Sequence, residues 1–182
     1  MKNLRSKRLL MRQWYLSDAD DLFEYAQNPL VGPPAGWSPH VKRADSERLI
    51  KELFQVQYFH WAIVLPERMK VIGGINLTQD PRRNYPQSRC LGYSMNPDFW
   101  GYGFMTEAAK GVLKYAFEYL KLAIVSVYHY PDNIRSRRVI EKCGFTYEGR
   151  LRQSSFLFNS KVLDNCCYSM TADEYKQLYM TE

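Results

Sequence analysis

Hydrophobic and polar residues alternate along the chain with two periods, which predict helices and strands in turn. The strongest helical pattern covers 105–120, where apolar side chains recur at spacings of three and four. Weaker helical patterns cover 19–27, 45–56, 133–143 and 172–179. Runs rich in β-branched and aromatic residues predict strands at 8–14, 60–65, 71–77, 90–95 and 123–130, followed by a hairpin of 145–158 and 161–170.

The order of these elements favours one mixed sheet. The strand at 123–130 follows a helix, and this path back favours a parallel neighbour. The segment 28–40 carries four prolines and two glycines, so we expect an ordered irregular loop there rather than a helix or a strand. Because the sequence contains no repeat and no linker, we expect a single α+β domain over 1–182.

Composition and charge narrow the class of protein. The 182 residues are 46% hydrophobic and 24% charged, which excludes a disordered or fibrous chain, and no apolar run is long enough for a membrane helix. The apolar stretch near the N-terminus is too short for a signal peptide, so we expect a cytoplasmic location. A net charge of +6 favours polyanionic partners, although a solvated basic surface is equally consistent with it.

The four cysteines and three histidines show no metal-ligand spacing and no C-x-x-C pair. We therefore expect neither a disulfide framework nor a bound metal. Cys143 lies at the end of a predicted helix, where the helix dipole raises the pKa of a thiol. A covalent route through this cysteine is therefore the less favoured chemistry.

The segment 96–108 places Gly101 and Gly103 between a predicted strand and the longest predicted helix. Backbone N–H groups in such a turn, together with the positive end of the helix, favour an anion such as phosphate. A tight turn packed against Trp100 is the alternative. Nicotinamide and nucleoside-triphosphate chemistry are disfavoured, because Thr106 replaces the third glycine of a dinucleotide fingerprint and the Gly-Lys-Ser/Thr of a Walker loop is absent.

A second polar segment begins the predicted helix at 133–143. Asn133 and Ser136 lie three residues apart and therefore share a face of this helix. Helix capping is an alternative role for Asn133, since asparagine is a preferred N-cap. Three nearby arginines offer cations to a phosphate, although a helix that presents arginines to solvent is the commoner arrangement. They are Arg135, Arg137 and Arg138.

Three motifs occur together: W-G-Y-G-F-M-T-E-A at 100–108, N-x-x-S-x-x-V-x-E-K-x-G-F at 133–145 and Y-E-G-x-L-R at 147–152. In this combination the chain, from about Leu10 to Met170, resembles the GNAT superfamily of N-acetyltransferases, in the branch that contains the ribosomal-protein N-terminal acetyltransferases. Two positions depart from the superfamily pattern: Asp98 stands where Arg or Gln is frequent, and Tyr102 where Lys or Arg is frequent.

The resemblance implies a single-domain fold with a splayed, mixed seven-stranded sheet flanked by helices on both faces. It also implies acetyl-CoA as co-substrate, held between the fourth and fifth strands, with no metal. The backbone of Ser94 and Met95 would pair with the pantetheine arm, with Asn133 on the pantetheine or acceptor side and Ser136 near the thioester sulfur. The turn that would receive the pyrophosphate comprises Trp100, Gly101, Tyr102, Gly103, Phe104, Met105 and Thr106.

The implied reaction is direct attack of a neutral primary amine on the thioester carbonyl. Lysine amines have a pKa of about 10.4 and α-amines of about 7.7 to 8.0, so the acceptor must lose a proton first. By the resemblance Glu148 would take this proton, directly or through water, while Ser136 would hydrogen-bond or protonate the departing thiolate. An N–H near Met95 would meet the oxyanion. The alternatives are an ordinary first-turn hydroxyl for Ser136 and, for Glu148, an exposed strand carboxylate paired with Arg150 or Arg152.

The acceptor is expected to be a protein N-terminus or a small amine, bound by a monomer or a homodimer. We expect its pocket to be lined by Trp37, His40 and Phe156, although Trp37 equally suits a core position. Two other classes stay open: a non-catalytic acyl-CoA-binding module, and a basic ribosome- or nucleic-acid-associated domain. Nucleic acid is the less expected partner, because acidic residues are interleaved with the basic ones.

Overall fold

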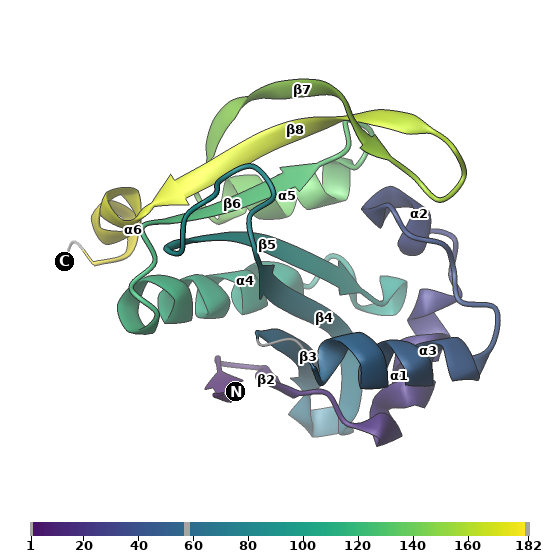
Figure 1. Cartoon of the computed structure of the whole chain (residues 1–182). Coiled ribbons are helices and arrows are strands. Elements are labelled where there is room, and N and C mark those ends of the chain that lie inside the picture. Colours follow the sequence, from purple (N-terminus) through teal and green to yellow (C-terminus); the bar gives the residue numbers. More distant parts are fainter. Residues whose placement is uncertain (1, 57–58, 181–182) are drawn as a thin grey trace. The chain divides into compact units, whose positions relative to one another are not determined.

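The structure is a computed structural model that describes residues 2–56 and 59–180 (Figure 1). Its strands are β1 (Leu4–Arg5), β2 (Leu10–Gln13), β3 (His60–Leu65), β4 (Lys70–Thr78), β5 (Ser88–Met95), β6 (Ile124–His129), β7 (Thr146–Phe156) and β8 (Val162–Thr171). Its α-helices are α1 (Ala19–Ala26), α2 (Gly32–Ala35), α3 (Arg43–Leu49), α4 (Phe104–Lys114), α5 (Ile134–Lys142) and α6 (Ala172–Tyr179).

The strands form a mixed sheet in the order β1-β2-β3-β4-β5-β6-β8-β7, with helices flanking it (Figure 1). The predicted α+β class is confirmed, but the predicted number of seven strands is wrong. The eighth strand is β1, in which Leu4 pairs with Met11 and Arg5 with Leu10. Two residues are too few to show the alternating pattern from which strands are predicted.

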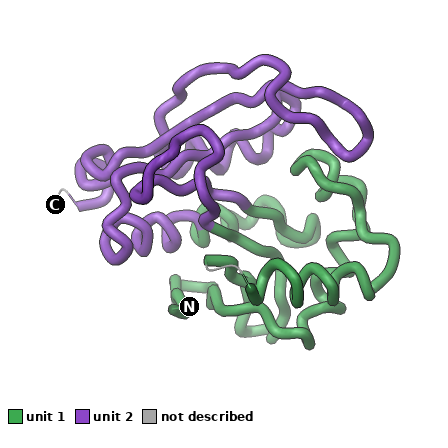
Figure 2. The backbone as a smooth tube through the Cα atoms, viewed as in Figure 1, with its two compact units in different colours: residues 1–76, 93–108 green, residues 77–92, 109–182 purple. Residues whose placement is uncertain are grey.

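The chain divides into two compact units (Figure 2). Unit 1 comprises residues 1–76 and 93–108, and unit 2 comprises residues 77–92 and 109–182. The cofactor turn predicted at 100–106 therefore belongs to unit 1, and the predicted base Glu148 belongs to unit 2.

Unit 1 contains an antiparallel ladder of β1 to β4. All six residues of β3 are buried, as expected for an uninterrupted apolar run. α1 buries side chains at spacings of three and four against this ladder. One core cluster contains Leu22 and Tyr25 of α1 together with Trp14, Ile50 and Val71.

Two predicted boundaries in unit 1 are wrong. The Pro-rich segment contains the short helix α2, which begins at Gly32 and has prolines in its first turn, where a missing N–H costs nothing. α3 begins at Arg43 rather than at 45 or 46, and Asp45 instead accepts hydrogen bonds from the N–H groups of Val41 and Lys42. The helix then continues through a π-helical turn, Ile50–Phe54.

His60 begins β3 and is buried without a hydrogen-bond partner for its Nε2 in the described part of the chain. Its ring stacks on Phe54 at a centroid distance of 5.4 Å. Burial lowers the pKa of His60 to about 4. The imidazole of His60 is protonated near pH 6.5 in the unfolded chain and only near pH 4 in the folded chain. The contribution of neutral His60 to the free energy of unfolding is therefore complete above pH 6.5 and is lost as the pH falls toward 4.

Replacing His60 by Phe is expected to make unfolding less sensitive to acid. Between pH 7 and pH 5 the free energy of unfolding should fall by about 2 kcal/mol less in the variant than in the wild type. Urea denaturation followed by tryptophan fluorescence at several pH values measures this difference. Parallel pH dependence in both proteins would contradict a histidine that stays neutral in the fold.

Unit 2 contains the parallel pair and the C-terminal hairpin. The predicted parallel neighbour of 123–130 is confirmed, because β6 pairs with β5. β8 pairs antiparallel with both β6 and β7, around a turn at Ser160. The helix predicted at 105–120 is α4 followed by a π-helical turn, Tyr115–Tyr119, and α6 has the predicted bounds.

The parallel pairing of β5 and β6 is short. It comprises Ser88 with Ile124, Arg89 with Val125 and Cys90 with Ser126. Within unit 2, β5 continues to Gly92 and β6 to His129 beyond the last pair of this ladder. The two strands thus stop pairing before they end, which agrees with the predicted splay.

Candidate active site

The turn between β5 and α4 is a short, ordered segment in unit 1. A 3₁₀ turn, Pro97–Phe99, follows the strand, and the Asn96 side chain caps it by accepting a hydrogen bond from the N–H of Asp98 at 3.1 Å. Gly101 and Gly103 then adopt positive φ values of 85° and 78°, which favour glycine. A Cβ at Gly101 would meet no atom within 4 Å. The turn is therefore open on its outer side, next to the first N–H groups of α4.

An ion pair from the N-terminal segment fixes this turn. Both oxygens of the Glu107 carboxylate accept hydrogen bonds from Arg8: Oε1 from its backbone N–H at 2.8 Å and Oε2 from Nε at 2.7 Å. Ser6 donates to Oε1 as well, at 2.7 Å. Burial raises the pKa of Glu107, but these hydrogen bonds outweigh it and lower the pKa overall. The same guanidinium donates to the carbonyl of Tyr102 at 3.1 Å and lies over the Phe104 ring at 4.4 Å.

The end of β5 leads into this turn through a tryptophan anchor. Trp100 Nε1 donates to the carbonyl of Met95 at 2.9 Å. On the β4 side the backbone lies very close, because a Cβ at Gly73 would be 2.5 Å from the carbonyl oxygen of Ser94. The predicted cofactor residues Ser94, Met95 and 100–106 therefore all lie in the segment 94–106 of unit 1.

The start of α5 carries the two polar residues predicted there. Asn133 is the N-cap of this helix and accepts a hydrogen bond from the N–H of Ser136 at 3.1 Å. The capping role is therefore confirmed for Asn133. Both residues are half-buried, whereas the helix presents its arginines to solvent. These arginines are Arg135, Arg137 and Arg138.

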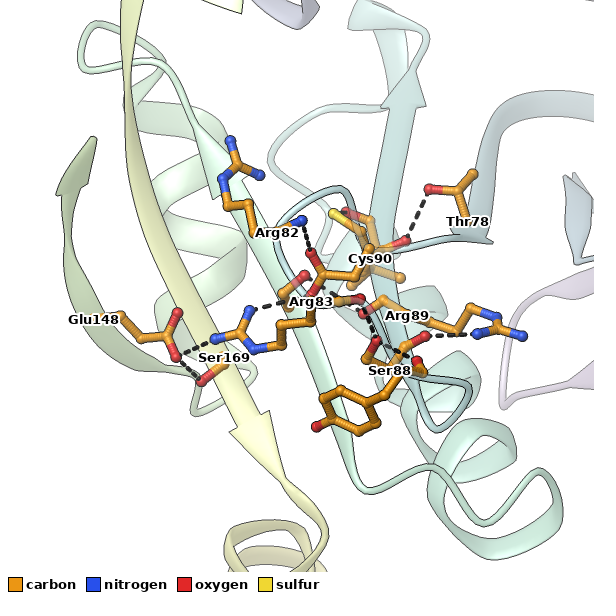
Figure 3. A network of polar contacts seen from close by, with 12 residues as sticks. Thr78, Arg82, Arg83, Ser88, Arg89, Cys90, Glu148 and Ser169 are labelled. Carbon is orange, nitrogen blue, oxygen red and sulfur yellow. Dashed lines mark hydrogen bonds and ion pairs between the residues drawn. The ribbon is translucent and has the colours of Figure 1, made fainter. Parts of the chain in front are cut away.

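Glu148 on β7 belongs to a polar network of unit 2 (Figure 3). Its Oε1 forms an ion pair with Arg83 Nη2 and accepts a hydrogen bond from Ser169 at 2.8 Å. Arg83 Nη1 contacts Asp80 Oδ2 at 3.1 Å, and the Asp80 side chain is fully buried. The alternative reading paired Glu148 with Arg150 or Arg152, and this pairing is wrong. Glu148 pairs with Arg83, whereas Arg150 pairs with Asp164 on β8 at 2.6 Å.

The pKa shifts in this network follow from burial and charge. Burial raises the pKa of Asp80, but hydrogen bonds from the Arg82 N–H, Ser126 and Arg83 outweigh it, so that the pKa lies below its ordinary value. For Arg83 burial lowers the pKa, and the contacts with Glu148 and Asp80 raise it overall. Both groups are therefore charged near neutral pH.

The residues predicted to bind the acceptor lie in different environments. Trp37 is half-buried and packs against the core of unit 1, which agrees with the alternative that it occupies a core position. His40 borders a cavity of about 530 Å³ that is also lined by Asp45, Arg48 and Glu52. Burial lowers the pKa of His40, whose Nδ1 lies 2.7 Å from Ser46 Oγ. Phe156 belongs to unit 2 and is 77% exposed.

Comparison with known proteins identifies the fold and the family. The family model of the GNAT acetyltransferase domain matches residues 8–146. The chain belongs to the GNAT acetyltransferase family. Among its relatives, the uncharacterised N-acetyltransferase p20 of Bacillus licheniformis is 27% identical over 179 residues, which cover 96% of this chain and 99% of the relative.

Two solved structures show the same GNAT fold. The ribosomal-protein-S5-alanine acetyltransferase of Vibrio fischeri has a TM-score of 0.77 at 20% identity and covers 97% of this chain and 100% of its own. The microcin C7 self-immunity acetyltransferase MccE, solved with acetyl-CoA and AMP, has a TM-score of 0.76 at 20% identity, with 91% and 93% covered. The predicted GNAT resemblance is thus confirmed, and with it an acyltransferase that uses acetyl-CoA.

Two ion pairs of the candidate residues were not predicted from the sequence. Arg8 and Glu107 lie 99 residues apart, and Arg83 and Glu148 lie 65 residues apart. No local pattern links residues at such separations. Among the described residues no helix is long and apolar enough to span a membrane.

Proposed function

We propose that this GNAT protein transfers the acetyl group of acetyl-CoA to a primary amine, either a protein N-terminus or a small amine. The observation that carries the proposal is the open turn at Gly101 and Gly103, which precedes α4 and is fixed by the ion pair of Arg8 and Glu107. This turn presents N–H groups at the positive end of a helix, which suits a diphosphate.

The residues of the turn fit the donor. Positive φ at two glycines and the open space at Gly101 leave room for phosphate oxygens close to the backbone. The residues assigned to the pyrophosphate are Trp100, Gly101, Tyr102, Gly103, Phe104, Met105 and Thr106, and those assigned to the pantetheine arm are Ser94, Met95 and Asn133. When bound, acetyl-CoA supplies an activated acetyl thioester.

For this reaction the protein must take a proton from the acceptor amine and stabilise the thiolate that leaves. Glu148 takes the proton of the acceptor amine through Oε2, which has no hydrogen-bond partner among the described residues, whereas Oε1 is held. Ser136 lies in the first turn of α5 and supports the thiolate that leaves as the new amide bond forms. Cys143 offers no covalent route, because it is buried and burial raises the pKa of its thiol to about 12.

The acceptor site is assigned to Trp37, His40 and Phe156. A protein N-terminus is supported by the fold shared with the Vibrio fischeri ribosomal-protein-S5-alanine acetyltransferase. Chemistry favours the same acceptor, because an α-amine with a pKa of about 8 is far less protonated near neutral pH than a lysine.

Release of CoA thiol with a panel of acceptors tests the proposal. Peptides with a free N-terminal amine are expected to react at pH 7.5 faster than Nα-acetylated peptides of the same sequence that carry a lysine, by at least about 10-fold. A thiol-reactive dye measures the rate, and mass spectrometry locates the acetyl group. Binding of acetyl-CoA without thiol release for any amine would favour the non-catalytic module instead.

A further inference from the structure

Arg83 lies between two carboxylates in unit 2 (Figure 3). Its Nη1 contacts Asp80, and its Nη2 contacts Glu148. The first carboxylate is buried and the second is about one-third exposed, with side-chain exposures of 0% and 35%. One guanidinium thus connects a buried anchor to the carboxylate that faces solvent.

At the buried end of this series of contacts, hydrogen bonds hold Asp80 and the loop that carries Arg83. Asp80 Oδ1 accepts a hydrogen bond from the N–H of Arg82 at 2.9 Å. Ser88, at the start of β5, donates to the carbonyls of Arg83 at 3.0 Å and of Tyr85 at 2.8 Å. The loop that carries Arg83 is therefore tied to the start of β5 at the arginine and at Tyr85. An ion pair with a buried carboxylate restricts the guanidinium further.

At the solvent-facing end, the same contacts fix the position of the Glu148 carboxylate. Arg83 and Ser169 both contact Oε1 of Glu148, so that the side chain is fixed through one oxygen and the second oxygen is left for another partner. A register shift between Tyr147 and Gly149 gives the strand an irregular conformation at this residue. A carboxylate on such a strand needs contacts from outside the strand to hold one rotamer.

The charged and titratable groups around Glu148 are few. Arg83 faces it from the loop, with Asp80 behind, and the Cys167 thiol lies on β8. Burial raises the pKa of Cys167, so this thiol is neutral. Arg83 is therefore the cation in direct contact with the Glu148 carboxylate.

We propose that Arg83, anchored by Asp80, is a positioning residue that holds the general base Glu148 with Oε1 fixed and Oε2 available. The inference rests on the proposed function, since it concerns the same proton transfer. It follows the general pattern in which a catalytic base is oriented by a third group.

Replacing Arg83 by Gln tests the inference. The turnover number is expected to fall about 10- to 100-fold while the KM for acetyl-CoA stays unchanged. Arg83→Lys, which keeps a cation at this position, is expected to restore only part of the turnover number. Arg150→Gln removes an arginine that pairs with Asp164 on the same hairpin and serves as the matched control.

A double-mutant cycle separates this inference from the proposed function. Arg83→Gln combined with Glu148→Gln should be no slower than Glu148→Gln alone, because Arg83 acts only through Glu148. Wild-type rates in Arg83→Gln, or effects that multiply in the double variant, would overturn the inference. If Arg83→Gln fails to fold by circular dichroism, the turnover numbers of Arg83→Lys and Asp80→Asn decide, and wild-type turnover in both variants overturns the inference. A wild-type protein that releases no thiol rejects the proposed function itself.

Discussion

Gly103→Val is expected to weaken acetyl-CoA binding at least about 100-fold, which corresponds to about 2.7 kcal/mol. The residue has a φ of 78°, which a β-branched side chain adopts only with strain of about 1 to 3 kcal/mol. The added atoms would also lie beside the N–H groups assigned to the diphosphate, where Arg8 Nη2 at 3.8 Å is the single neighbour within 4 Å of a Cβ. Isothermal titration calorimetry with acetyl-CoA measures the change.

Two controls distinguish a blocked site from a damaged fold. Gly36→Val introduces the same side chain at a φ of 92° in the same unit, but outside the segment assigned to the cofactor. It should reduce thermal stability and leave acetyl-CoA affinity within about 3-fold of the wild type. Gly103→Ala, with less added volume, should show an intermediate loss. Normal binding by Gly103→Val would reject the assignment of this turn to the diphosphate.

The elements of the fold were largely predictable because their burial patterns are local. β3 is a continuous buried run, and its predicted bounds are those of the structure. α6 begins after Thr171, whose hydroxyl accepts a hydrogen bond from the N–H of Glu174, and a capping box of this kind is readable from sequence. β1 and α2 were missed for the opposite reason: each is so short that tertiary contacts, rather than periodicity, determine its conformation.

In the candidate site, too, the contacts between residues close in sequence were predictable and the contacts between distant residues were not. The glycine turn and the Asn133 cap depend on residues close in sequence, so the motif contains both. The partners of Glu148 depend on tertiary structure. Sequence proximity suggested Arg150, but Arg150 pairs with Asp164 on β8, and Arg83 reaches Glu148 from the loop before β5. A one-residue register shift is enough to exchange the neighbours of a strand residue.

The ion pairs of the two units make the same kind of contribution, which is to the geometry of the groups that they hold. Arg8 and Glu107 are partly exposed, with side-chain exposures of 40% and 17%, and such a pair adds little to stability. Its value lies in geometry, because it ties the N-terminal segment to the first turn of α4 and to the carbonyl of Tyr102. Arg83 and Asp80 act in the same way on Glu148. In both places an arginine from a distant segment fixes a group that the motif alone leaves free.

Glu148→Gln is expected to lower turnover by about 100- to 10,000-fold at pH 7, with acetyl-CoA affinity nearly unchanged. Glutamine keeps the shape and an oxygen for Arg83 and Ser169, but it cannot accept the proton of the amine. Asp164→Asn, which neutralises another arginine-paired carboxylate on the hairpin, should retain wild-type turnover. Steady-state thiol release across pH 6 to 10 provides the measurement, and full activity of Glu148→Gln at every pH would show that the base lies elsewhere.

The pH dependence of this variant also identifies the acceptor. Without a base, the rate follows the fraction of amine that is already neutral, so activity should rise with pH until the acceptor has lost its proton. An α-amine acceptor would bring this rise to a plateau near pH 8, and a lysine-like amine only above about pH 10. The wild type, in which Glu148 is proposed to remove the proton in the complex, should instead be active at lower pH with the same acceptor. The separation between the two profiles therefore measures what the carboxylate contributes to deprotonation.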